Sequence, residues 1–197
     1  TMTSFLFTLC FAFFLVLVTA TKVWLANQHI RTIAANRHQV PPAFVGTITQ
    51  AAHQKAADYT IAKTHVGLIE LVLGAAVVIG WTLLGGLNQL NQFLLMLLPS
   101  GMQQQVALLL AFVLIGSLID MPMSLYQTFW VEEQFGFNKM TLKIWLIDSL
   151  KSLLIGLLVG LPLIAGVLWL MAQMGTYWWL WTWAFWTAMS LILMVVY

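Results

Sequence analysis

The chain has 197 residues, of which 61% are hydrophobic and 7% charged, and its formal net charge is +2. About a quarter of the residues of a water-soluble globular domain are charged, so this composition excludes a soluble globular protein. The small net charge identifies no partner by itself, and we expect none that is a nucleic acid. The chain is therefore predicted to lie in a membrane.

Five apolar runs are long enough to cross a bilayer, because about 30 Å of hydrocarbon takes about 20 helical residues. Backbone groups in lipid must be satisfied internally, and the runs lack the alternation of strands, so each run is predicted to be a helix. The prediction is an all-α integral membrane protein with one membrane domain over residues 1–197. Its five transmembrane helices are expected near residues 4–26, 64–87, 106–129, 146–171 and 176–197.

The distribution of positive charge predicts the orientation. No Lys or Arg precedes the first run, so this run is predicted to be a retained span and not a signal peptide. By the positive-inside rule, the first and third loops are cytoplasmic and the N-terminus is outside. All eight basic residues lie in or beside these two loops: Lys22, Arg31, Arg37, Lys55, Lys63, Lys139, Lys143 and Lys151.

The first loop is predicted to form a helical hairpin on the cytoplasmic face. Residues 29–39 continue the first helix, Pro41 and Pro42 break it, and residues 47–65 have helical propensity. The second loop, over residues 87–105, is too apolar at its centre for full exposure to water. We expect it to lie in the outer interface or to re-enter the membrane.

The last two spans carry packing and interface signals. Gly156 and Gly160 form a small-xxx-small pattern that allows close approach of helices, and Pro162 is expected to kink the fourth span. The fifth span ends at Tyr197 without a polar flank, so we expect the chain to be the front part of a longer protein. An aromatic belt at the interface is predicted from five tryptophans: Trp178, Trp179, Trp181, Trp183 and Trp186.

Three acidic residues lie within or at the ends of spans, in their predicted cytoplasmic halves. A charge at the bilayer centre costs roughly 2.5 to 3.5 kcal/mol, so such a residue usually faces water or a partner. Asp148 is expected to pair with Lys151, three residues further along the helix. Glu70 and Asp120 have no basic neighbour one turn away, and we interpret them as residues that line a hydrated chamber.

No catalytic or metal-ligating set can be assigned in the sequence. The single cysteine, Cys10, lies inside the first span, so there is no disulfide framework and no cysteine cluster. None of the four histidines is spaced to bind metal with another, and there is no HExxH, GxSxG, P-loop or CxxC motif. The chain alone is predicted to be inactive as an enzyme and to bind no cofactor.

The stretch from Asp120 to Leu163 resembles the N-terminal membrane domain of the type I CAAX prenyl proteases, which are multi-spanning zinc metalloproteases. Val40 to Pro42 and the run from Lys55 to Tyr59 resemble the loop before that family's second span. The first stretch matches the family pattern at nine positions: Tyr126, Phe129, Glu132, Glu133, Gly136, Phe137, Asn138, Thr141 and Leu142.

The resemblance implies a non-catalytic front portion of such a protease. In the family the zinc is held by an HExxH helix and a downstream Glu, none of which this chain contains, so zinc is expected only in the full-length protein. The implied partners are the lipid bilayer, a downstream catalytic domain and a peptide or membrane-protein substrate. The loop predicted to dock the catalytic domain contains Glu132, Glu133, Phe135, Phe137, Asn138 and Lys139.

Two other classes of function stay open at this point. The chain could be a transporter or channel that uses Glu70 and Asp120 as proton or cation sites, or a stand-alone membrane assembly protein. Prenyl dependence does not follow from the residues. We expect a bacterial inner membrane in preference to the endoplasmic reticulum, with a role in membrane-protein quality control.

Overall fold

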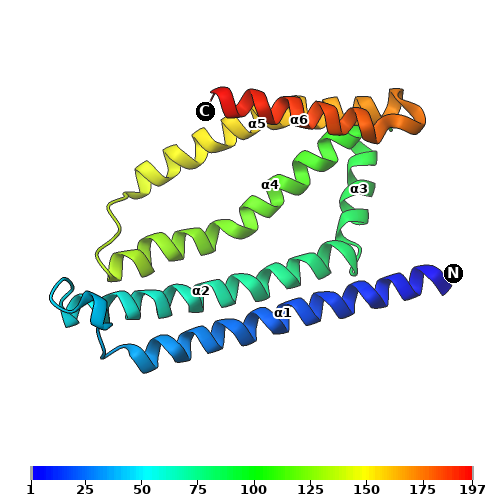
Figure 1. Ribbon diagram of the computed structural model, residues 1–197. Helices are drawn as coiled ribbons and strands as arrows, with labels where there is room; N and C mark the ends of the chain where they lie inside the picture. The colour runs from blue at the N-terminus through cyan, green and yellow to red at the C-terminus, as the bar shows by residue number, and fades with distance from the viewer. Residues whose placement is uncertain (1, 197) are drawn as a thin grey trace. The chain divides into compact units, whose positions relative to one another are not determined.

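The structure, a computed structural model, describes residues 2–196, and the regular secondary structure of this part is entirely helical (Figure 1). Five of its helices are long and apolar enough to cross a membrane. This confirms the predicted all-α membrane fold with five spans. The elements are α1 (Met2–Asn36), η1 (Pro42–Phe44), α2 (Gln50–Thr82), α3 (Gly86–Leu97), α4 (Met102–Tyr126), η2 (Gln127–Glu132), α5 (Leu142–Gln173), η3 (Gly175–Tyr177) and α6 (Trp178–Val196).

The chain divides into two compact units, and helix α4 contributes to both. The first unit contains residues 1–86 and 119–140, and the second contains residues 87–118 and 141–197. Large apolar side chains are exposed along the helices of each unit, as on Phe13 of α1 and Leu158 of α5. Such surfaces suit a lipid environment, where the hydrocarbon solvates them.

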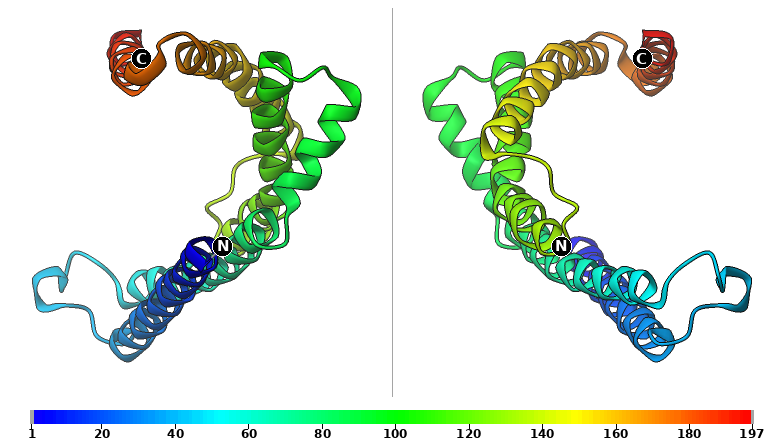
Figure 2. Two further views of the ribbon diagram at one scale, coloured as in Figure 1. Left: turned by 90° about the vertical axis from the view of Figure 1, so that its right-hand side faces the viewer. Right: turned by 90° about the vertical axis from the view of Figure 1, so that its left-hand side faces the viewer.

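The first unit is built on a hairpin of α1 and α2, which lie side by side (Figures 1 and 2). Helix α1 continues beyond the predicted first span and ends at Asn36, shortly before Pro41 and Pro42, where a helix cannot continue. Thr49 then caps α2, because its hydroxyl accepts a hydrogen bond from the backbone N–H of Ala52 at 3.2 Å. The two arms of the predicted first-loop hairpin are therefore continuations of the spanning helices.

A π-helix, η2, joins the hairpin within the same unit. It follows α4 directly, and Pro122 inside α4 lies about one turn before the change in helix type. The η2 segment packs on α2. Val131 of η2 and Ala57 and Val66 of α2 are the buried apolar residues of this unit in the described part of the chain. The packing brings the following loop, residues 133–141, next to α2.

In the second unit, α5 and α6 pack against each other. A Cβ atom added at Gly166 of α5 would lie 2.7 Å from Cζ of Phe185 in α6, so only glycine allows this approach. At Gly156 and Gly160 an added Cβ would meet nothing within 4 Å. Among the described residues, the close contact of α5 with α6 therefore lies at Gly166 and not at the small-xxx-small pattern. The small-xxx-small pattern records where close approach is possible, and the partner's side chain decides where it occurs.

The predicted second loop is mostly helical. Helix α2 ends at Thr82, before the predicted end of its span at residue 87, and α3 begins at Gly86. Gly85 has a φ of +78°, a conformation that glycine adopts readily, in the short turn between α2 and α3. Within the second unit, the side chain of Gln104 in α4 donates a hydrogen bond to Asn91 of α3. The amide-rich composition of this segment thus supplies a link between α3 and α4.

Candidate functional site

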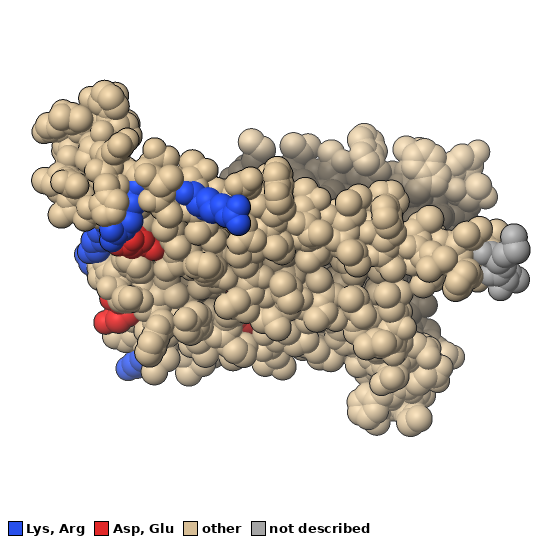
Figure 3. Space-filling view, turned by 90° about the horizontal axis from the view of Figure 1, so that it is seen from below, with Lys and Arg blue, Asp and Glu red and all other residues tan. Residues whose placement is uncertain are grey.

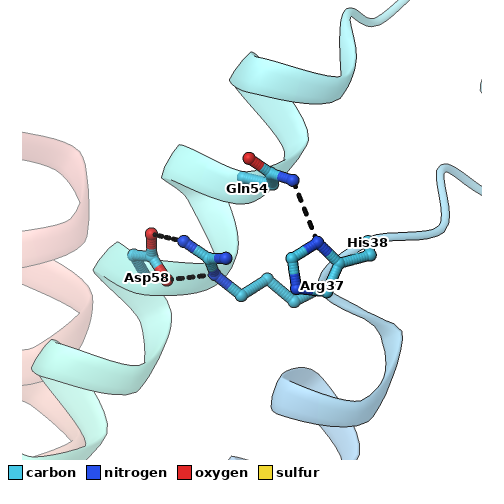
Figure 4. A network of polar contacts seen from close by, with 4 residues as sticks. All are labelled: Arg37, His38, Gln54 and Asp58. Carbon is cyan, nitrogen blue, oxygen red and sulfur yellow. Dashed lines mark hydrogen bonds and ion pairs between the residues drawn. The ribbon is translucent and has the colours of Figure 1, made fainter.

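The polar residues of the first unit gather toward the end of the α1–α2 hairpin, where an ion pair joins its two arms. Arg37, just after α1, donates two parallel hydrogen bonds to the carboxylate of Asp58 in α2, each 2.6 Å long (Figure 4). Bidentate geometry makes this a strong form of the arginine–carboxylate contact. The hydrogen bonds also raise the pKa of the Arg37 guanidinium, so its positive charge is held more firmly.

Two further hydrogen bonds join the same arms. The Gln54 amide donates to Nδ1 of His38 at 3.1 Å, beside the ion pair (Figure 4). Nε2 of His53 lies 3.1 Å from the backbone carbonyl of Asn36, and because a carbonyl can only accept, that nitrogen carries the proton. His38 and His53 thus serve the hairpin closure. We call the side chains of Arg37, His38, His53, Gln54 and Asp58 the hairpin clasp.

An aromatic cluster lies one residue beyond the clasp. The Tyr59 ring contacts Phe135 edge-to-face, with centroids 5.4 Å apart, and Phe137 in the same manner at 4.9 Å. Nζ of Lys55 lies 5.3 Å from the centre of the Phe137 ring, and Nζ of Lys63 lies 5.9 Å from that of Tyr59, both within cation–π range. These contacts attach the predicted docking loop to α2.

The loop is also held by its own hydrogen bonds. The backbone N–H groups of Phe137 and Asn138 both donate to the carbonyl of Glu132, at 2.9 and 3.2 Å. The Asn138 side chain donates to the Glu133 carboxylate at 2.9 Å and accepts from the backbone N–H of Met140 at 2.7 Å. Gly136 has a φ of +70° between the two phenylalanines, which explains glycine at this position. The loop therefore has a defined conformation.

The surface of this loop is only partly covered. Phe137 remains 52% exposed although it contacts Tyr59 and Lys55, whereas Phe135 is half-buried. Glu133 and Lys139 are exposed on either side of Phe137. An exposed aromatic ring flanked by charges of both signs is typical of a binding surface, because it combines apolar area with directed polar contacts.

Glu70 lies in an open groove between α1 and α2. The groove has a volume of about 490 Å³ and is lined by Lys22 and Ala26 of α1 and by Thr64, Gly67, Leu68, Glu70 and Leu71 of α2. A basic residue of the neighbouring helix thus lines the same groove as Glu70, which reasoning within a single helix could not reveal. No ion pair links Lys22 and Glu70 in the part of the chain that the structure describes.

The other two intramembrane acids have different surroundings. Asp148 pairs with Lys151 at 3.7 Å, which confirms that prediction. Asp120 belongs to the first unit, is exposed, and does not line the groove that contains Glu70. Glu70 therefore shares its groove with Lys22, while the chamber predicted for Glu70 and Asp120 stays a prediction.

Among residues 2–196, no group of three or more His, Cys, Asp and Glu side chains is placed to hold a metal ion. His65 and Cys10 are exposed on α2 and α1. What the unit offers is a clasped hairpin, an ordered loop with an exposed ring, and a groove with two opposite charges. Figure 3 shows the charged side chains toward one end of the face it displays, while the other end carries none.

Sequence reasoning missed part of this site. Tyr59, Lys55, Arg37 and Asp58 were not predicted to act together, although the run from Lys55 to Tyr59 was noted as a family resemblance. The spacing of the residues within that run already indicated that they could act together. Lys55, Asp58 and Tyr59 are three and four residues apart, so they share one side of a helix and can face the preceding arm and the later loop.

The structure defines a five-span α-helical membrane domain. The family described as CAAX prenyl protease N-terminal, five membrane helices, matches residues 29–197. The chain belongs to this family, and the resemblance seen in the sequence is confirmed. The chain is thus an N-terminal membrane domain of the CAAX prenyl protease type.

Comparisons with individual proteins agree. The chain is 27% identical over 165 residues to CAAX prenyl protease 1 homolog of Arabidopsis thaliana, covering 80% of this chain and 39% of the relative. It is 34% identical over 84 residues to the Caenorhabditis elegans homolog, covering 43% of this chain and 19% of the relative. The crystal structure of S. mikatae Ste24p shares the fold, with a TM-score of 0.85 at 22% identity, covering 93% of this chain and 44% of that one. The chain thus spans less than half the length of these relatives.

Proposed function

We propose that this chain is the membrane-embedded front portion of a zinc metalloendopeptidase and that it carries the surface on which the catalytic segment rests. The observation that supports this most directly is the ordered loop after η2. Phe137 is held by Tyr59 and Lys55 and is still half exposed. A loop that is fixed in shape before binding loses little conformational entropy when a partner docks.

In this proposal the zinc ligands come from a downstream segment of the same protein. A catalytic zinc site needs three protein ligands and an open position, and the described residues offer no such set. The docking contacts are Phe137 in an apolar pocket of the partner, Glu132 and Glu133 with its basic groups, and Lys139 with an acidic group. Phe135 and Asn138 hold the loop in shape from beneath.

The substrate class that we propose is a membrane-associated peptide, prenylated or belonging to a membrane protein. Water for hydrolysis would reach the bond through a hydrated chamber, to which we assign Glu70 and Asp120. Glu70→Gln and Asp120→Gln are then expected to be mild for folding. Leu→Asp on a lipid-facing position at equal depth, such as Leu73→Asp, is expected to abolish insertion because the acid would face hydrocarbon.

The experiment that tests the proposal uses the full-length parent protein. Cleavage of a farnesylated peptide and of its unprenylated counterpart is measured before and after chelation and zinc replacement. We expect activity that depends on zinc and falls at least about tenfold in Phe137→Ala, the loss of about 1.4 kcal/mol of docking. Leu158→Ala, an exposed residue of α5, is the control. A parent that cleaves neither peptide, or a Phe137→Ala variant with full activity, contradicts the proposal.

We also propose the orientation that the basic residues predict, with the N-terminus outside and the clasp and loop in the cytoplasm. For the host membrane, the bacterial inner membrane stays our prediction. The relatives compared above, from a plant and a worm, are eukaryotic, which argues for the endoplasmic reticulum. The membrane in which the tagged full-length protein is found, when it is expressed in its source cells, decides between the two.

The alternative of a transporter or channel has less support. It requires Glu70 and Asp120 to cooperate along one ion path. Glu70 instead shares a groove with Lys22, and Asp120 does not line that groove. A nearby ammonium group competes with a transported cation for the carboxylate, which lowers the affinity of such a site.

A further inference from the structure

The groove between α1 and α2 holds two opposite charges that do not neutralise each other directly. Lys22 lies on α1 and Glu70 on α2, and both line the same space of about 490 Å³. Two of the other lining residues are small, Ala26 and Gly67. A Cβ atom added at Gly67 would meet nothing within 4 Å, so the space at this glycine is open. The groove can therefore take a group that carries both a negative and a positive charge.

The level of the groove along the hairpin is set by the clasp. At about 1.5 Å per residue, Lys22 and Glu70 each lie about 20 Å along their helices from the Arg37–Asp58 pair. Trp24, two residues from Lys22, is 60% exposed on α1. A tryptophan and a lysine within one turn at the end of an apolar run are typical of the boundary between hydrocarbon and head groups. The Lys22 side of the groove thus lies near the phospholipid head groups, within reach of a lipid from the surrounding leaflet.

We infer that this groove binds the head group of a phosphatidylethanolamine molecule from the surrounding leaflet. Its phosphate would contact the ammonium group of Lys22, and its own ammonium group would donate to the carboxylate of Glu70. Phosphatidylcholine fits less well, because a quaternary ammonium has no N–H to donate and is bulkier. Phosphatidylglycerol offers a phosphate to Lys22 but no cation to Glu70. This inference does not depend on the protease proposal.

The test uses the whole chain in micelles that contain equal amounts of phosphatidylethanolamine, phosphatidylcholine and phosphatidylglycerol. Native mass spectrometry then measures which lipids remain bound. We expect phosphatidylethanolamine to be retained over phosphatidylcholine by about tenfold, as suits one charge-assisted hydrogen bond. Glu70→Gln should make the retention of phosphatidylethanolamine equal to that of phosphatidylcholine, because only the contact with the ammonium group is lost. Lys22→Gln should reduce the retention of all three lipids.

A second variant fills the groove without changing charge. Gly67→Leu should displace the head group, because the new side chain occupies the open space between the helices. Its control is Gly74→Leu on the same helix, where an added Cβ also meets nothing within 4 Å and which does not line the groove. A thermal unfolding curve for each variant tests whether the folded state persists.

Equal retention of phosphatidylethanolamine and phosphatidylcholine by the unaltered chain overturns the inference. So does an equal effect of Gly67→Leu and Gly74→Leu. In either case the groove does not select the ethanolamine head group. The proposed peptidase function would be untouched, because its test is cleavage by the full-length protein and not lipid retention.

Discussion

The ring of Phe137 meets the ring of Tyr59 edge-to-face, with centroids 4.9 Å apart, and so attaches the loop after η2 to helix α2. Tyr59 makes the same kind of contact with Phe135. An aromatic pair contributes about 0.5 to 1.5 kcal/mol beyond the area it buries. The two pairs together are therefore the main side-chain link between α2 and the loop.

Removal of this ring should release the loop without unfolding the helices. In Tyr59→Ala, we expect hydrogen exchange over residues 133–139 to rise several-fold, since two aromatic contacts are lost. Tyr59→Phe keeps both ring contacts and should match the unaltered protein. Tyr177→Ala, an exposed residue in the second unit, is the control. Unchanged exchange in Tyr59→Ala would show that the loop's own hydrogen bonds are sufficient.

The hairpin clasp should respond to a reversal of charge. Arg37→Glu places a carboxylate beside Asp58, and we expect faster proteolysis of the segment between α1 and α2 because the arms repel each other. The double variant Arg37→Glu with Asp58→Arg should recover most of the protection, since it restores the opposite charges. Lys151→Glu, which disturbs an exposed pair with Asp148, should leave this segment unchanged. The prediction fails if the double variant is as sensitive as Arg37→Glu.

Helix contact in the second unit depends on one glycine. Gly166→Leu must displace Phe185, which lies within 2.7 Å of an added Cβ, and overpacking of this kind costs about 1 to 3 kcal/mol. Gly156→Leu on the same helix has open space and should leave stability unchanged or slightly raised, because leucine favours helix more than glycine does. Thermal unfolding in micelles measures both. Equal losses for the two variants would contradict the close α5–α6 contact.

The orientation can be tested with single cysteines. After Cys10→Ser removes the natural thiol, Arg37→Cys and Lys139→Cys should resist a membrane-impermeant maleimide added from outside. Both should react once the membrane is opened, because their loops are predicted to be cytoplasmic. Ser100→Cys, in the predicted outer loop, is the control that should react from outside. Labelling of the Arg37→Cys or the Lys139→Cys variant in sealed cells would reverse the proposed topology.

Metal content gives a prediction for the chain by itself. The purified chain should contain no stoichiometric zinc, and chelation should not lower its unfolding temperature, because no described set of three ligands exists. It should also cleave no peptide. A tightly held zinc ion that is lost in His65→Ala or Glu70→Gln would overturn the assignment of zinc to a downstream segment.

The spans could be predicted from the sequence because lipid imposes a strong rule on length and polarity. The pairing of Asp148 with Lys151 was predictable for a related reason, since it depends only on positions three apart in one helix. Contacts between different helices were harder to predict from the sequence. Lys22 and Glu70 line one groove because α1 and α2 pack in a particular register. The sequence of either helix alone does not determine that register.

The same difficulty applies to the glycines and the loop. Phe185 selects Gly166, which follows no small-xxx-small signal, over Gly156 and Gly160. The sequence indicated that Phe135 and Phe137 need an apolar cover, and the structure shows that Tyr59 supplies part of it. A pattern within one segment shows what a side chain requires, whereas the fold determines which neighbour provides it.

Helices α1 and α2 run without a break from the apolar spans into the clasp. A continuous helix transmits tilt as a rigid rod, so the angle of the spans also sets the height of the clasp and of the attached loop above the lipid. Spans adjust their tilt when bilayer thickness changes, at a cost of fractions of a kcal/mol per Å of hydrophobic mismatch. Acyl-chain length in the host membrane therefore becomes a physical variable that positions the loop proposed for docking, without any change in the protein's own contacts.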